Sequence, residues 1–178
     1  MLIATILSAQ CTDERVNIVT QTLFKKYKTP LDFTRVPAEE LERDIYSTGF
    51  YKAKARNIQL CCSQLIERFE GEIPQTMEEL HSLSGVGRKT ANVVLGNAFG
   101  KNEGVTVDTH VTRICNLLGI VSSTNPEKIE RELMEIVPKE KWTMFTHLII
   151  SHGRAICIAR RPKCGECVLS SLCPSSRV

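Results

Sequence analysis

Four cysteines near the C-terminal end constrain the fold of this chain more than any other feature. They are separated by six, two and five residues and are Cys157, Cys164, Cys167 and Cys173. The segment that carries them is rich in Arg, Pro and Gly and is too short to bury a core of its own. Four soft thiolates so close together are typical ligands of zinc or of an iron–sulfur cluster. The sequence therefore predicts a C-terminal segment that folds around a metal centre.

Two alternatives to an iron–sulfur cluster follow from the cysteines themselves. Structural zinc sites usually have two C-x-x-C pairs, and this segment has one such pair. Disulfides require an oxidising compartment, but residues 1–9 lack the basic start of a signal peptide. We therefore expect a reducing intracellular compartment and free thiols. The remaining cysteines, Cys11, Cys61, Cys62 and Cys115, lie in or beside apolar helical patterns and are expected to be small core residues.

A glycine-rich turn between two helical patterns is the second strong feature. Gly85 and Gly87 flank Val86, and such a pair permits a tight turn and a close approach to the backbone. Residues 76–83 predict a short helix before the turn, and residues 88–99 predict a helix after it. The free N–H groups at the start of the second helix, together with Arg88, suit a phosphate group.

Lys89 and Asp108 are candidates for chemistry. Lys89 lies in the first helical turn after the glycines, where the helix dipole and Arg88 both disfavour a second positive charge. A neutral lysine amine is a nucleophile that can form a Schiff base. Asp108 follows one helix later and would stabilise developing positive charge or hold a water molecule. Taken alone, the two residues also fit a solvated lysine and a helix-capping aspartate.

Hydrophobic periodicity predicts an all-α fold with almost no strand pattern. The expected helices cover residues 1–9, 13–27, 38–46, 51–69, 76–83, 88–99, 109–119, 126–137 and 142–155. No apolar run is long enough to span a bilayer. The uncapped start at Met1 indicates either that a natural N-terminal segment precedes this point or that the start of the first helix is unusual.

The motifs together resemble the endonuclease III family of helix-hairpin-helix DNA glycosylases. The resemblance rests on Leu83-Ser-Gly-Val-Gly-Arg-Lys89, on Val107-Asp-Thr-His110 and on the cysteine spacing, which is similar to that of the family's [4Fe–4S] loop. It implies that Lys89 is the Schiff-base nucleophile, that Asp108 is the catalytic carboxylate and that the four cysteines hold a [4Fe–4S] cluster. The family usually has proline where this chain has Ser84, which should loosen the hairpin slightly.

The same resemblance implies a function and a two-lobed architecture. The chain is expected to be a bifunctional DNA glycosylase and AP lyase that removes oxidised pyrimidines through a lysine Schiff base and β-elimination. Residues 1–101 would form a helical barrel lobe and residues 102–178 an iron–sulfur lobe carrying Asp108, with the active site in the cleft between them. The expected partner is double-stranded DNA with damaged bases or abasic sites, bound by a monomer, in the cytoplasm at the nucleoid if the source is bacterial.

Further residues gain a DNA-binding interpretation from the resemblance. Gln10 matches a residue that fills the gap left by the extruded base, and Phe50 matches one that wedges into the duplex, although from the sequence alone Phe50 reads as a core aromatic. His110 and Arg113 are expected to face the DNA backbone. Residues 151–178 contain five basic residues against one acidic residue, Glu166. Three of the basic residues are expected to contact DNA: Arg160, Arg161 and Lys163.

Three other functions would share some of these motifs. A mismatch-specific adenine glycosylase would share the hairpin and the cysteines, but it would need a glutamate where this chain has Thr5, and it would lack Lys89. A non-catalytic helix-hairpin-helix protein that only binds DNA would have no need for Lys89 and Asp108 together. A redox-sensing iron–sulfur protein is the third. Substitution of Lys89 discriminates among them, because only the lyase depends on that amine.

Overall fold

The computed structural model describes all residues from 1 to 178 and contains helices but no strand. This confirms the all-α class predicted from the sequence. The chain forms two compact units, unit 1 (Met1–Phe99) and unit 2 (Gly100–Val178). Each unit has its own hydrophobic core. No helix combines the length and the apolar character needed to cross a membrane.

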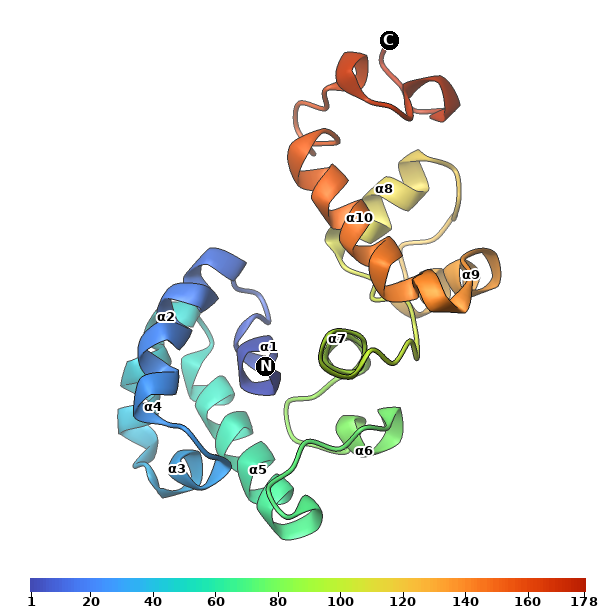
Figure 1. Cartoon of the computed structure of the whole chain (residues 1–178). Coiled ribbons are helices and arrows are strands. Elements are labelled where there is room, and N and C mark those ends of the chain that lie inside the picture. Colours follow the sequence, from blue (N-terminus) through green and yellow to red (C-terminus); the bar gives the residue numbers. More distant parts are fainter. The chain divides into compact units, whose positions relative to one another are not determined.

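Unit 1 is built from helices joined by short loops (Figure 1). They are α1 (Leu2–Leu7), α2 (Asp13–Lys26), α3 (Pro30–Arg35), α4 (Ala38–Ile45), the 3-10 turn η1 (Tyr46–Thr48), α5 (Tyr51–Phe69), α6 (Met77–His81) and α7 (Arg88–Phe99).

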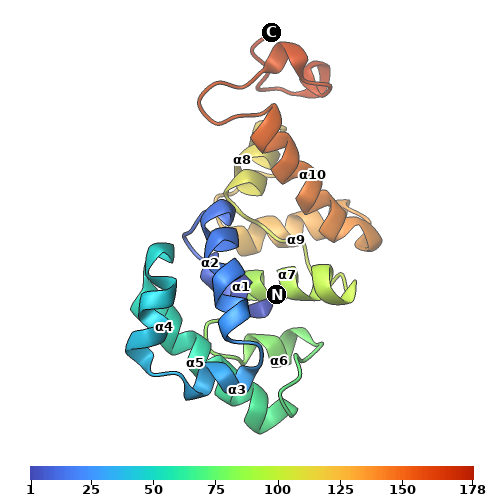
Figure 2. The same cartoon turned by 60° about the vertical axis from the view of Figure 1, so that its left-hand side comes forward.

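The long helix α5 organises the packing of unit 1. It contacts α1, α3, α4 and η1, and α3 and α4 lie beside it in both views (Figures 1 and 2). Its buried face includes Ala55, Ile58 and Leu65, which follow one another at intervals of three and seven residues. Phe69, which was expected on the same face, is only half-buried. The start and end of this helix agree with the sequence prediction.

Two details of unit 1 differ from the sequence prediction. The segment after Thr29-Pro30 was expected only to break a helix, but Pro30–Arg35 forms α3. Thr29 and Asp32 cap it reciprocally, and proline fits the first helical turn because its missing N–H has no intrahelical partner there. The cap of α2 is Thr12 rather than Asp13, since the Thr12 hydroxyl accepts the backbone N–H of Arg15.

Unit 2 contains three α-helices and three short 3-10 turns. They are α8 (Thr109–Leu117), α9 (Pro126–Ile136), η2 (Lys139–Lys141), α10 (Trp142–Ala155), η3 (Cys164–Glu166) and η4 (Ser170–Leu172). Helices α8 and α10 pack closely because Gly153 has no side chain. A Cβ atom there would lie 2.8 Å from both the His110 ring and the Ile114 side chain.

Helix α9 contributes Ile129 and Leu133 to the core of unit 2. The apolar periodicity of residues 129, 133 and 136 predicts that Ile136 belongs to this buried stripe, but that prediction is wrong because Ile136 is 59% exposed. It is the last residue of the helix, and the chain turns at Val137, whose carbonyl accepts the Trp142 indole N–H at 2.8 Å. This bond links the end of α9 to the start of α10.

Candidate functional site

The glycine turn between α6 and α7 is shaped by contacts with α5. Gly85 has a φ of +76°, which favours glycine, and a Cβ atom there would lie 2.9 Å from the Cβ of Asn57. Gly87 is different, because its φ is not positive and an added Cβ would meet nothing within 4 Å. Gly85 is therefore required by the fold, whereas the space beside Gly87 is open to a ligand.

Ser84 anchors the turn in a way that a proline could not. Its backbone N–H donates to the side-chain oxygen Oε1 of Gln64 on α5 at 2.7 Å. Leu83 and Val86 on either side of Ser84 and Gly85 are buried in the core of unit 1. The expected loosening from the missing proline is therefore offset by a hydrogen bond that needs the Ser84 N–H.

Lys89 and Arg88 open helix α7 directly after this turn. Both residues are exposed, while Ala91, Val94 and Leu95 hold the helix to the core. The first N–H groups of a helix lack intrahelical partners and carry the positive end of the dipole. The turn thus presents an amine and a set of backbone donors at one accessible place in unit 1.

Gln10 and Phe50 have a left-handed backbone, which in unit 1 they share with one other residue that is not glycine, Glu70 at the end of α5. Their φ values are 52° and 48°, which is uncommon for residues other than glycine. Both side chains are exposed, Phe50 to 67%. The interpretation of Phe50 as a core aromatic is therefore wrong. An exposed aromatic ring on a strained backbone is a candidate for contact with a partner.

Lys54 is a buried residue that the sequence analysis missed. It is 5% exposed, and its ammonium donates to the carbonyl oxygens of Leu7 and Thr48, each at 2.8 Å. Burial lowers the pKa of this amine. The sequence does contain a signal of this burial, because Lys54 lies four residues before Ile58 on the apolar stripe of α5. A lysine at such a position must find acceptors inside the protein.

Asp108 is the N-cap of α8 in unit 2. Its Oδ1 accepts the backbone N–H groups of His110 and Val111 at 2.9 and 2.8 Å, and its Oδ2 lies 3.2 Å from the His110 ring nitrogen Nδ1. The side chain is 17% exposed. This geometry is compatible both with a helix-capping aspartate and with a carboxylate that takes part in chemistry, since the cap uses mainly one of the two carboxylate oxygens.

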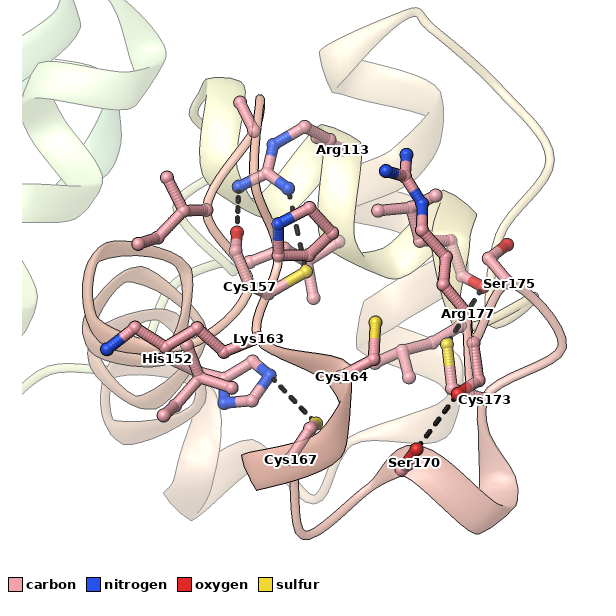
Figure 3. Close-up of a pocket in the computed structure, with 18 residues that line it drawn as sticks. Arg113, His152, Cys157, Lys163, Cys164, Cys167, Ser170, Cys173, Ser175 and Arg177 are labelled. Carbon is pink, nitrogen blue, oxygen red and sulfur yellow. Dashed lines mark hydrogen bonds between the residues drawn. The ribbon is translucent and has the colours of Figure 1, made fainter.

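Arg113 holds the cysteine segment rather than extending into solvent. Its guanidinium donates to the Cys157 carbonyl at 2.7 Å and lies 3.6 Å from the Cys157 sulfur (Figure 3). The expectation that Arg113 faces DNA stays a prediction. The exposed residues Arg160, Arg161 and Lys163 lie on the loop between Cys157 and Cys164, and Lys163 also pairs with Glu166 at 3.9 Å.

The four cysteines of the C-terminal segment line one cavity of about 260 Å³ in unit 2. Figure 3 shows them around a common space: Cys157 after α10, Cys164 and Cys167 at either end of η3, and Cys173 after η4. All eight cysteines are free thiols. Thiols are the donors that iron–sulfur clusters require, and Arg113, Lys163 and Arg177 also line the cavity. The donor set therefore fits a cluster of net negative charge.

Two family descriptions match the chain. Residues 3–139 match the HhH-GPD superfamily of base excision DNA repair proteins. Residues 157–173 match the iron–sulfur binding domain of endonuclease III. The second match confirms the cofactor predicted from the cysteine spacing, a [4Fe–4S] cluster, in preference to zinc or disulfides.

Curated relatives named endonuclease III are similar over nearly the whole chain. The protein of Synechocystis sp. is 55% identical over 177 residues, which cover 99% of this chain and 81% of the relative. That of Bacillus subtilis is 50% identical and covers 97% and 79%. That of Escherichia coli is 43% identical and covers 97% and 82%.

Solved structures agree with these relatives. A non-covalent endonuclease III–DNA complex matches with a TM-score of 0.93 and 50% identity, over 98% of this chain and 81% of that one. A trapped endonuclease III–DNA covalent intermediate has the same score and identity and covers 98% and 82%. A thermostable thymine-DNA glycosylase matches at a TM-score of 0.87 and 28% identity, with the same coverage. The chain therefore belongs to the endonuclease III family of base excision DNA repair enzymes, which are DNA glycosylases with AP lyase activity.

Proposed function

We propose that this protein removes oxidised pyrimidines from double-stranded DNA and cuts the strand, with Lys89 as the nucleophile. The observation that carries the proposal is the position of this lysine. It is exposed in the first turn of α7, directly after a turn that α5 anchors and that has open space at Gly87. An amine in the first turn of a helix, where the helix dipole favours anions, can reach a sugar while its phosphates bind the turn.

The chemistry of Lys89 follows from one amine. The neutral Nζ attacks C1′ of the damaged nucleotide, the bond from C1′ to the base breaks, and the base takes up a proton as it leaves. Opening of the sugar ring gives an imine between Nζ and C1′. Removal of a proton from C2′ expels the 3′ phosphate and cuts the strand on the 3′ side of the lesion. Water then hydrolyses the imine and releases the lysine.

Asp108 is proposed to assist the departure of the base. A carboxylate near C1′ would stabilise the positive charge that develops on the sugar as the bond to the base stretches. The α8 cap fixes the orientation of this carboxylate, because two backbone N–H groups hold Oδ1. Oδ2 faces the His110 ring and is the oxygen proposed to face the sugar.

The proposed contacts with DNA come from several loops. Backbone donors at Gly85 and Gly87, with Arg88, would bind phosphates of the damaged strand. Gln10 and Phe50, both exposed and strained, would occupy the space of the extruded base and wedge beside it. The exposed Arg160, Arg161 and Lys163 would contact phosphates further along the duplex, with His110 and Arg113 near the backbone. A single chain supplies all of these groups, so we propose a monomer.

We propose that Cys157, Cys164, Cys167 and Cys173 are the four ligands of the cluster. When bound, the cluster supplies a stable covalent centre for a segment that lacks a hydrophobic core of its own, and no step of base removal passes through it. Its role here is to hold the loop of Arg160, Arg161 and Lys163 in a fixed conformation.

Lys89→Gln tests the proposal in single-turnover reactions on a duplex with one oxidised pyrimidine. Base release and strand cleavage should both fall by at least about a thousandfold, while binding to the duplex changes little. Lys25→Gln, at an exposed lysine in the last turn of α2, is the control for loss of one positive charge. Base release by Lys89→Gln at the parental rate, without cleavage, would instead mean a glycosylase that does not use this lysine.

A further inference from the structure

Lys54 is the one buried lysine of the chain, and it joins two loops that are far apart in sequence. Its ammonium donates to the carbonyl of Leu7, 47 residues away, and to the carbonyl of Thr48, six residues away, each at 2.8 Å. The residue lies on α5 at 5% exposure. Its side chain therefore forms a bridge from the central helix of unit 1 to α1 and to η1.

The two acceptors end helical segments. Leu7 is the last residue of α1, and Thr48 is the last residue of η1. Carbonyl groups at a helix C-terminus lack intrahelical donors and carry partial negative charge, so a cation is a suitable partner for them. One buried ammonium is the donor to both ends at once and so ties them to each other and to α5.

Each acceptor lies two or three residues before a strained and exposed residue of unit 1, and the third such residue, Glu70, lies at the other end of α5. Gln10 follows Leu7 by three residues, and Phe50 follows Thr48 by two. Their left-handed backbones persist only where surrounding contacts hold them, because this conformation is unfavourable for residues with a Cβ atom. The Thr48 hydroxyl adds a bond to the Ile45 carbonyl at 2.8 Å, which fixes the start of the Phe50 loop further.

We propose that Lys54 is a positioning residue that sets the Gln10 and Phe50 loops at a fixed separation for insertion into the duplex. The inference rests on the proposed DNA contacts of Gln10 and Phe50. Lys54 itself touches neither DNA nor the reacting atoms. Its loss would leave the chemistry of Lys89 intact but would impair extrusion of the damaged nucleotide, because the wedge and the group that fills the gap would no longer be held together.

Comparison of two substrates separates extrusion from chemistry. The first is a duplex with one oxidised pyrimidine, which requires extrusion. The second is a single-stranded oligonucleotide with an abasic site, which requires only the lyase chemistry. The variants are Lys54→Met, which keeps the aliphatic length without donors, and Lys54→Arg, which restores donors and charge. Lys52→Met, at an exposed lysine of the same helix, is the matched control.

We expect Lys54→Met to slow base release from the duplex by about tenfold or more and to change cleavage of the single strand by less than about twofold. Lys54→Arg should recover much of the duplex activity, and Lys52→Met should match the parent on both substrates. The substitution Phe50→Ala should slow the duplex reaction less in the Lys54→Met variant than in the parent, because Lys54 and Phe50 act on the same step.

Three results would overturn the proposal. Parental duplex activity in folded Lys54→Met would show that the bridge is not needed for extrusion. Equal losses on both substrates, with a lowered melting temperature, would assign Lys54 to the stability of unit 1 alone. If Lys54→Met does not fold, Lys54→Gln, which has a shorter and neutral donor, replaces it. Failure of every Lys54 variant to fold would likewise assign Lys54 a purely structural role. Failure of the proposed function would differ from all of these, since Lys89→Gln would then keep its activity.

Discussion

Asp108 caps helix α8, and in the proposed function its carboxylate also stabilises the charge that develops on the sugar. Its Oδ1 accepts two backbone N–H groups and so caps α8, while its Oδ2 faces the His110 ring. Capping thus restricts the carboxylate to one orientation, which is what a group that stabilises a developing charge requires. The two roles can be separated by experiment, because asparagine caps a helix about as well as aspartate but carries no charge.

Asp108→Asn should strongly reduce the rate of base release. It should change the unfolding free energy by only ~0.3 kcal/mol relative to the parent. Asp108→Ala should lose both activity and about 1 kcal/mol of stability, because the cap is removed as well. Single-turnover rates and denaturant unfolding measure the two effects. Asn125→Ala removes the cap of α9 and is the control, with lower stability but parental activity. Parental activity in Asp108→Asn would contradict a role for the charge.

The buried thiols predict how stability depends on pH. Burial raises the pKa of Cys61 and Cys115 from 9.0 to about 11 and that of Cys62 to about 12. Between pH 9 and the raised values, the unfolded chain loses thiol protons that the folded chain retains. The unfolding free energy should therefore fall as the pH rises through this window.

Cys62→Ala should make this alkaline loss of stability shallower, although the cavity lowers its stability at neutral pH. Denaturant unfolding at a series of pH values from about 8 to about 10.5 measures the slope. Cys115→Ala, which removes a buried thiol from the core of unit 2, should make the slope shallower as well. An unchanged slope in Cys62→Ala would mean that other groups cause the alkaline loss.

Among the elements of unit 1, the helix-hairpin-helix segment is anchored to α5 by a long-range hydrogen bond. Gln64 on α5 accepts the Ser84 N–H at 2.7 Å, 20 residues further along the chain. Gln64→Ala should cost about 1 kcal/mol of stability, the usual value of one hydrogen bond, and should weaken binding to DNA. Gln64→Glu keeps an acceptor and should retain most of both.

A double-mutant cycle tests whether this bond is the cause. Ser84→Pro removes the N–H donor, so its stability effect should not add fully to that of Gln64→Ala. Thermal unfolding of the two single variants and the double variant gives the coupling. Full additivity would show that Gln64 supports the turn by another route.

Elements with several agreeing signals were predictable from the sequence. The bounds of α5, α7 and α10 match, because periodic apolar residues run between clear start and stop residues. Helix α3 was missed since its six residues are too few to form an apolar stripe, and Thr29-Pro30 fits both a break and a capped start. Lys89, Asp108 and the cysteines were recognisable as local motifs. The apolar stripe of α5 indicates that Lys54 is buried, but no local pattern identifies the distant partners of Lys54 and Gln64, which are Leu7 and Ser84.

At the scale of the whole molecule, the C-terminal segment has no buried residue of its own. The core of unit 2 extends from Val105 to Ile149, and after Gly153 every residue is exposed or only half-buried. The stability of residues 157–178 should therefore depend on the cluster, whereas the cores of both units do not.

Removal of iron by oxidation and chelation should raise amide hydrogen exchange across residues 157–178 while α5, α8 and α9 remain protected. Mass spectrometry after proteolysis measures the change. Affinity for duplex DNA should fall, because the loop with Arg160, Arg161 and Lys163 loses its fixed conformation. Equal deprotection of α5 would contradict this and would indicate that the cluster stabilises the whole chain.

The proposed function depends above all on Lys89 being the nucleophile. The most direct measurement is borohydride reduction of the protein during its reaction with a duplex carrying one oxidised pyrimidine, followed by digestion and mass spectrometry of the cross-linked peptide. We predict that the reduced sugar is attached to Lys89 and that Lys89→Gln forms no adduct. An adduct on another lysine or on the N-terminal amine would show that Lys89 is not the nucleophile. A full yield of adduct with Lys89→Gln would show the same.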